Sequence, residues 1–204
     1  MLSEEDGKFL LKIARDAIEK FVNGERADKP DEYPEALNAE LGVFCTLNKK
    51  DKRKDAKQKD AQGASDGSCV KRLRGCIGMP YPVMPLIKAV ISSACSACED
   101  PRFKKLSKNE LGDIKIEVSV LTEPKLIEVE KPDDYLKNIE PKKHGLILQY
   151  GPYSGLFLPQ VWEDIPDKTE FLDNLCLKAG LTPGMWKERD IKIYSFEAQI
   201  FEEE

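Results

Sequence analysis

The chain of 204 residues is 41% hydrophobic and 34% charged, so it can build an apolar core and is too polar to reside in a bilayer. Its 37 acidic and 32 basic residues give a net charge of −5, whereas a nucleic-acid-binding protein is expected to present a basic surface. The composition therefore indicates a globular protein with neither a nucleic acid nor a membrane as partner.

The N-terminus and the cysteines indicate a cytoplasmic protein. Residues 1–7 are acidic and lack the basic start and apolar run of a secretory signal. The longest apolar stretch, residues 83–98, is interrupted by Lys88 and is shorter than the ~20 residues of a membrane-spanning helix. We expect the six cysteines to be reduced thiols rather than a disulfide framework.

The first 50 residues predict a helix followed by a strand. Apolar residues recur at helical spacing up to about Asn23, after a capping box formed by Ser3 and Asp6 and before Gly24. The apolar run at residues 42–47 then suits a buried strand.

Residues 49–68 are rich in lysine and then in small polar residues. We expect a flexible basic insert, solvated and joining two strands. The alternative is a basic tether for an acidic partner. No aromatic residues alternate with the lysines, so stacking on nucleic-acid bases is not indicated.

The middle of the chain predicts a strand, a buried helix and a second strand. Residues 69–79 suit a strand that ends in glycines, and residues 86–98 suit a helix whose sides are apolar or small all round. Residues 114–121 alternate between apolar and polar side chains, as in a strand with one buried face.

The last third predicts a hairpin, a helix and a long strand. Residues 144–150 and 155–158 form the hairpin, and Asp167 caps a helix that ends at Gly180. Residues 191–201 suit a strand with a bulge near residues 194–195. The order of elements predicts an α+β fold, with a mainly antiparallel sheet flanked by helices.

The segment Arg72-Leu-Arg-Gly-Cys-Ile-Gly78 carries the densest chemical signal. Gly75 and Gly78 permit sharp turns and close approach of a substrate, so Cys76 could be a nucleophile beside N–H groups that bind an oxyanion. Arg74 could favour the thiolate. The alternative is a small buried cysteine in a strand that turns tightly because of packing.

Two further residues complete a candidate catalytic set. His144 is the only histidine, and it could be the general base that a nucleophilic cysteine needs. Alternatively it is a hydrogen-bonded structural histidine. Glu117, on the polar face of the alternating strand, could orient His144 or bind substrate, and a solvated carboxylate is the simpler alternative.

A metal site is a weaker possibility. Cys95-Ser-Ala-Cys98, together with Cys69 and Cys76, could form a four-thiolate zinc or iron–sulfur site. The pair lies within a predicted buried helix, without the turn that is common in metal-binding loops. We therefore expect two core residues one turn apart, with no metal and no cofactor.

The segment Asp100-Pro-Arg-Phe103 follows the same helix. Pro101 ends the helix and Phe103 can anchor the loop in the core. Arg102 is then left to bind an anionic substrate or to form a structural salt bridge with a carboxylate.

Six motifs occur in a characteristic order: Leu73-Arg-Gly-Cys-Ile-Gly78, Asp100-Pro-Arg-Phe103, Glu117-Val-Ser-Val-Leu121, Lys143-His-Gly-Leu146, Gly155-Leu-Phe-Leu-Pro-Gln-Val161 and Lys178-Ala-Gly-Leu181. Together they closely resemble the AMMECR family, named for the Alport-syndrome, midface-hypoplasia and elliptocytosis chromosomal region. The form of the third motif is similar to the archaeal and bacterial branch. The insert at residues 49–68 is longer than the resemblance leads us to expect.

The resemblance implies one AMMECR-type domain over residues 1–204. Its larger part would come from both chain ends and its smaller part from the middle, with a cleft between them that lies near Cys76. Prokaryotic members are associated with a Memo-like protein of the extradiol-dioxygenase type and with a radical SAM protein, which implies a shared modification pathway.

Three functional hypotheses follow. The first is a thiol-dependent transferase or hydrolase that acts on a small metabolite or a modified side chain, with Cys76, His144 and Glu117 as catalytic residues. Its substrate-binding residues would be Arg74, Gly75, Gly78 and Arg102. The second is a non-catalytic adaptor for the Memo-like and radical SAM proteins, and the third is the thiolate metal site.

Overall fold

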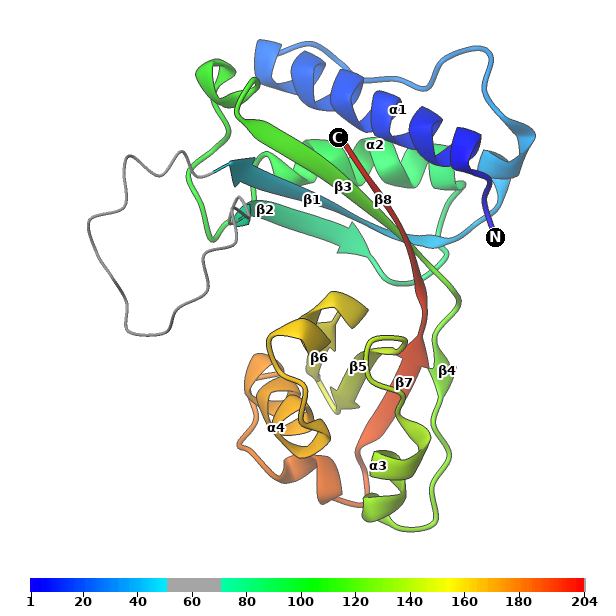
Figure 1. Ribbon diagram of the computed structural model, residues 1–204, viewed down its shortest axis with the longest axis vertical. Coiled ribbons are helices and arrows are strands. Elements are labelled where there is room, and N and C mark those ends of the chain that lie inside the picture. Colours follow the sequence, from blue (N-terminus) through cyan, green and yellow to red (C-terminus); the bar gives the residue numbers. More distant parts are fainter. Residues whose placement is uncertain (51–70, 204) are drawn as a thin grey trace, which may run out of the picture. The chain divides into compact units, whose positions relative to one another are not determined.

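The computed structural model describes residues 1–50 and 71–203, and the chain divides into two compact units (Figure 1). The first unit comprises Met1–Met79, Val83–Ser119 and Ile200–Glu204. The second unit comprises Pro80–Pro82 and Val120–Gln199. Each unit contains one four-stranded sheet.

The first unit has a sheet with two long helices on one face (Figure 1). The strand order is β2-β1-β3-β8, and β2 is an edge strand. Its elements are α1 (Glu4–Asn23), η1 (Glu35–Asn38), β1 (Gly42–Lys50), β2 (Lys71–Met79), α2 (Leu86–Ala97), η2 (Lys108–Glu110), β3 (Ile114–Leu121) and β8 (Ala198–Glu202).

The core of this unit follows from the periodicity of its elements. The side chains of α1 that recur every three or four residues are buried, among them Leu10, Ala14 and Ile18. Alternate residues of the strands, such as Val43 and Ile116, are fully buried, which leaves the residues between them on the opposite face of the sheet.

The second unit has a sheet of order β4-β7-β5-β6 and a core that contains both tryptophans. Trp162 stacks on Phe171, with ring centroids 3.6 Å apart, and Trp186 is 1% exposed. Its elements are β4 (Lys125–Leu126), η3 (Pro132–Asp134), α3 (Tyr135–Asn138), β5 (Gly145–Tyr150), β6 (Tyr153–Phe157), η4 (Pro159–Glu163), α4 (Lys168–Lys178), η5 (Met185–Lys187) and β7 (Lys192–Phe196).

The predicted α+β class with antiparallel sheets is confirmed. The Ser3 side chain accepts a hydrogen bond from the backbone N–H of Asp6, and the Asp6 carboxylate accepts from the N–H of Ser3, so the capping box is present. The first strand continues through Lys50, three residues past the apolar run. Most of the predicted basic insert, and Cys69, lie outside the described residues.

Two predicted elements need correction. The predicted hairpin left residues 151–154 as the turn. Because Tyr150 pairs with Tyr153, the turn consists of residues 151 and 152 alone, and residues 153 and 154 already belong to β6. The single strand predicted at residues 191–201 is two strands, β7 and β8, which belong to different sheets.

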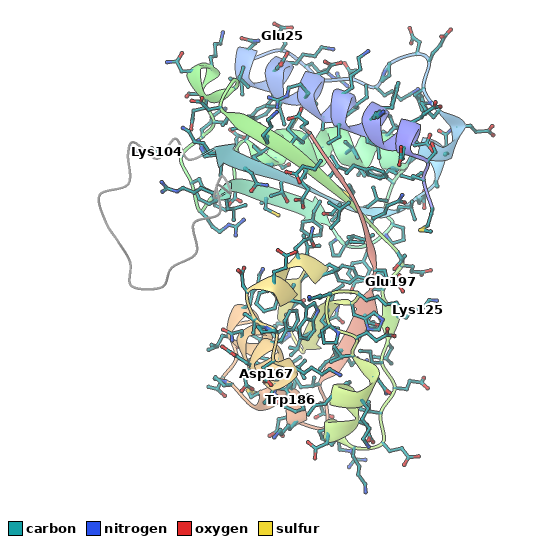
Figure 2. The ribbon with its side chains drawn as sticks, viewed as in Figure 1. Glu25, Lys104, Lys125, Asp167, Trp186 and Glu197 are labelled. Atoms are coloured by element: carbon teal, nitrogen blue, oxygen red, sulfur yellow. The ribbon has the colours of Figure 1, made fainter. Side chains whose placement is uncertain are left out.

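The break between β7 and β8 lies at Glu197, not at the predicted bulge (Figure 2). The backbone N–H of Glu197 donates to the Thr122 hydroxyl, and the Glu197 carbonyl accepts from the Thr122 N–H. These two bonds hold the segment outside either sheet ladder. Among the described residues, no helix is long and apolar enough to span a membrane.

Candidate active site around Cys76

Cys76 lies in the edge strand β2 of the first unit, opposite Thr46 of β1. The Thr46 hydroxyl donates a hydrogen bond to Cys76 Sγ at 3.3 Å. Thr46 is 9% exposed, and Cys76 is half-buried. A hydroxyl donor stabilises a thiolate more than a thiol, so this contact favours the reactive form of the sulfur.

The backbone of Cys76 is held by the turn that follows α2. Its N–H donates to Asp100 Oδ2 at 2.8 Å, and its carbonyl accepts from Arg102 Nη2 at 3.2 Å. An edge strand otherwise exposes such groups unpaired, so the turn completes the hydrogen bonding of β2 at this point. The N–H of Cys76 itself is therefore engaged by Asp100.

Arg102 forms the salt bridge that was the alternative to substrate binding. Its Nε donates to Asp100 Oδ1 at 3.0 Å and its Nη2 to Oδ2 at 2.6 Å. This guanidinium, helped by the N–H groups of Cys76 and Arg102, lowers the pKa of the fully buried Asp100 carboxyl to about 2. The Arg102 side chain is 51% exposed, so one side of it remains open to solvent.

Gly75 and Gly78 make close backbone contacts. A Cβ added at Gly75 would lie 2.3 Å from the carbonyl oxygen of Ala97, and one at Gly78 would lie 2.1 Å from that of Val43. Glycine is required at both positions by packing. A role in substrate binding remains a prediction.

Arg74 binds the loop between α2 and β3. Its Nε and Nη2 donate to the two carboxylate oxygens of Glu110 at 2.9 and 3.1 Å, and Nη2 also donates to the Lys104 carbonyl. The guanidinium, together with donors from Ser107, lowers the pKa of Glu110 to about 2. The positive charge of Arg74 is thus largely neutralised by Glu110.

Glu117 lies in β3 on the face with alternating polar residues, as predicted, and is half-buried. Its Oε1 accepts a hydrogen bond from the Ser119 hydroxyl at 3.4 Å. Ser119 has no exposed surface, so the Glu117 carboxylate has a buried hydrogen-bond donor beside it.

His144 belongs to the second unit, whereas the other candidate residues belong to the first. Its Nδ1 accepts the backbone N–H of Glu140 at 3.2 Å, and its Nε2 lies 4.0 Å from Glu140 Oε1. Its carbonyl accepts from Trp162 Nε1 at 2.7 Å, which anchors the segment to the core. Because Nδ1 is an acceptor here, the neutral ring carries its proton on Nε2.

Of the other described thiols, Cys45, Cys98 and Cys176 are buried, and Cys95 is half-buried like Cys76. Burial raises the pKa of Cys98 to about 12 and that of Cys45 well above its ordinary value, and it also raises those of Cys95 and Cys176. All five cysteines within the described ranges are free.

The thiolate metal site gains no support from these positions. Cys98 Sγ donates to the Ala94 carbonyl within α2, and Cys95 Sγ lies 3.8 Å from the Ala17 carbonyl of α1. No group of three or more metal-ligating side chains gathers anywhere in residues 1–50 and 71–203. Cys69, the fourth proposed ligand, is outside those residues.

Three residues of this site escaped the sequence analysis: Thr46, Glu110 and Asp100, the last of which was quoted in a motif without a role. Thr46 is a polar side chain inside an apolar strand, which is a usable signal. Glu110 is bound to Arg74, 36 positions earlier, and Asp100 to Cys76, 24 positions earlier. No local sequence pattern predicts contacts between residues so far apart.

The chain is similar over nearly its whole length to archaeal proteins. A family model described as AMMECR1 matches residues 11–201. Protein MJ0810 of Methanocaldococcus jannaschii is 44% identical over 205 residues, which cover 100% of this chain and 92% of that protein. Protein NEQ441 of Nanoarchaeum equitans is 43% identical over 197 residues, which cover 96% of this chain and 99% of that protein.

A solved structure shares the fold. The crystal structure of the uncharacterized protein PH0010 from Pyrococcus horikoshii matches with a TM-score of 0.85 and 41% sequence identity, and the match covers 98% of this chain and 92% of that one. The resemblance inferred from the six motifs is thereby confirmed.

Proposed function

Because the chain belongs to the AMMECR1 family and holds the cysteine of its Leu-Arg-Gly-Cys-Ile-Gly motif in a distinct environment, we propose that it is a thiol-dependent enzyme. Cys76 is the nucleophile and His144 is its partner in proton transfer. The substrate is a small metabolite or a modified side chain.

The observation that carries the proposal is the hydrogen bond from the Thr46 hydroxyl to Cys76 Sγ. Cys76 combines this donor with a half-buried position and with a backbone fixed on both sides by Asp100 and Arg102. The other described thiols lack this combination, and burial disfavours their thiolates. A fixed, donor-stabilised thiol is what nucleophilic catalysis requires.

In the proposed reaction, the Cys76 thiolate forms a bond to the electrophilic atom of the substrate, and the leaving group departs with the electron pair of the broken bond. The proton from the thiol passes to His144 and then to the leaving group. Water or an acceptor nucleophile next displaces Sγ, which completes a hydrolysis or a transfer.

The role of His144 sets a condition on its ring. His144 can accept the thiol proton only at a ring nitrogen that carries no proton, and in the neutral ring described above that nitrogen is Nδ1, which already accepts the Glu140 N–H. Proton transfer to His144 therefore requires that the 3.2 Å bond from the Glu140 N–H to Nδ1 open. The half-exposed Arg102 is suited to an anionic substrate group, and Glu117 to a second polar contact.

The test is native-state alkylation with peptide mapping at pH 7, in a Cys69→Ser background that removes the one cysteine outside the described residues. We expect Cys76 to react at least ~10-fold faster than Cys95. A tenfold ratio of rates corresponds to a difference of only about 1.4 kcal/mol in activation free energy. Cys45 and Cys98 should react only after denaturation. If Cys76 reacts no faster than Cys95, the thiol enzyme is rejected in favour of the adaptor for Memo-like and radical SAM proteins.

A further inference from the structure

A pocket of about 440 Å³ opens in the first unit beside the end of β1 and the start of β2. Its third wall is the loop between α2 and β3, to which Lys104 belongs (Figure 2). The volume lies within the range of about 300–1,000 Å³ that is typical of small-ligand sites. Cys76 does not line it.

The wall of the pocket is strongly basic. Five of its residues are cationic, and Glu110 is the single acid among the lining residues. The whole chain has a net charge of −5, so this concentration of positive charge is local. The five cations are Lys49, Arg72, Arg74, Lys104 and Lys105.

Some of these charges are compensated within the protein and some are not. Glu110 pairs with Arg74 and lies 3.5 Å from Lys49 Nζ, and Lys105 pairs with Glu99 at 2.7 Å. Within the described residues, no ion pair engages Arg72 or the Lys104 side chain. Both of these cations are exposed and lie in the wall of the pocket.

Arg74 provides a buried donor without a partner. Its side chain is only 11% exposed, and its Nε and Nη2 are bound to Glu110 and to the Lys104 carbonyl. Its Nη1 is buried with no hydrogen-bond partner among the described residues.

The remaining wall is apolar. Leu73 is 37% exposed and Phe103 is half-buried, and both line the pocket. Cations beside an apolar surface suit a ligand that has both an anionic and an apolar part. Several cations that include a planar guanidinium favour a phosphoryl dianion over a single carboxylate.

We propose that this pocket binds a small organic phosphate. The phosphoryl group is held by Arg72 and Lys104, and the apolar part packs on Leu73 and Phe103. The site is independent of the proposed thiol chemistry, because it needs no group of Cys76 or His144.

The experiment is calorimetric titration of the full chain at low ionic strength with phenyl phosphate and with inorganic phosphate. We expect phenyl phosphate to bind at least ~5-fold more tightly, because only it can use the apolar wall. Lys104→Gln and Arg72→Gln should each weaken binding at least ~5-fold. Cys76→Ala should bind as tightly as the wild type, which keeps this result separate from that for the thiol enzyme.

The matched control is Lys108→Gln, which removes the same charge from the same loop at a residue that does not line the pocket. An equal loss of affinity in this variant would reduce the effect to general charge attraction and overturn the proposal. Equal affinity for phenyl phosphate and inorganic phosphate would show that the apolar wall does not contribute to binding, and would overturn the proposal that the ligand is an organic phosphate. Tighter binding of a single-stranded oligonucleotide than of phenyl phosphate would make the surface a nucleic-acid site instead.

Discussion

The carboxylate of Asp100 accepts the backbone N–H of Cys76 at 2.8 Å, and through this bond the turn after α2 fixes the central cysteine of the edge strand. The Arg102 guanidinium donates both to the Asp100 carboxylate and to the Cys76 carbonyl, so it adds a second link between the turn and the cysteine. The position of the thiol thus depends on an ion pair between the buried Asp100 and the half-exposed Arg102, and not on the strand alone.

Replacing Asp100 by Asn should destabilise the fold by about 2 kcal/mol at pH 7, because a pKa held near 2 instead of 3.8 stabilises the native state by about that much. The folded-state pKa is depressed, so this contribution is present above about pH 4 and is lost as the pH falls towards 2. Urea unfolding of both proteins between pH 7 and pH 2.5 should show the difference shrinking in acid. Asp31→Asn, at an exposed carboxylate, is the control, and a difference that does not change with pH would refute the assignment.

Thr46→Val should slow alkylation of Cys76 about 5- to 10-fold at pH 7, since it removes one hydrogen bond worth about 1–1.5 kcal/mol to the thiolate. Thr46→Ser keeps the hydroxyl and should react at nearly the wild-type rate. The measurement is the second-order rate constant for the mapped Cys76 peptide. Equal rates in the Val and Ser variants would show that the hydroxyl has no influence on the sulfur.

Gly78→Ala should destabilise the fold by about 1–3 kcal/mol, because the new Cβ would meet the Val43 carbonyl at 2.1 Å and the backbone would have to move. Gly112→Ala is the matched control, since a Cβ there has nothing within 4 Å. That substitution should be neutral or stabilise by up to about 1 kcal/mol. Chemical denaturation of both variants decides the point, and a tolerated Gly78→Ala would indicate that β1 and β2 are more loosely packed than described.

Features set by neighbouring residues could be predicted from the sequence. The cap of α1 depends on residues three positions apart, and β3 follows from alternation over eight residues. The N-cap of α4 is likewise local, because Asp167 accepts the backbone N–H of Glu170. Such short-range patterns do not depend on the rest of the fold.

Features set by distant residues could not be predicted. Asp100 and Cys76 are joined across 24 positions, and Arg74 and Glu110 across 36. The break at Glu197 also escaped prediction, because its cause is a pair of bonds to Thr122, 75 residues earlier. The motifs directed attention to Cys76, but its hydrogen-bond partners emerge only from the fold.

The central claim, that Cys76 and His144 act together, is tested most directly by the rate of Cys76 alkylation as a function of pH from 5 to 9 in the wild type and in His144→Ala. Lys143→Ala, one residue away, serves as the control for disturbance of the segment. We predict that the His144→Ala rate is about tenfold lower at pH 7 and rises only towards pH 8.5, where an ordinary thiol ionises. Superimposable profiles for the wild type and His144→Ala would contradict the account.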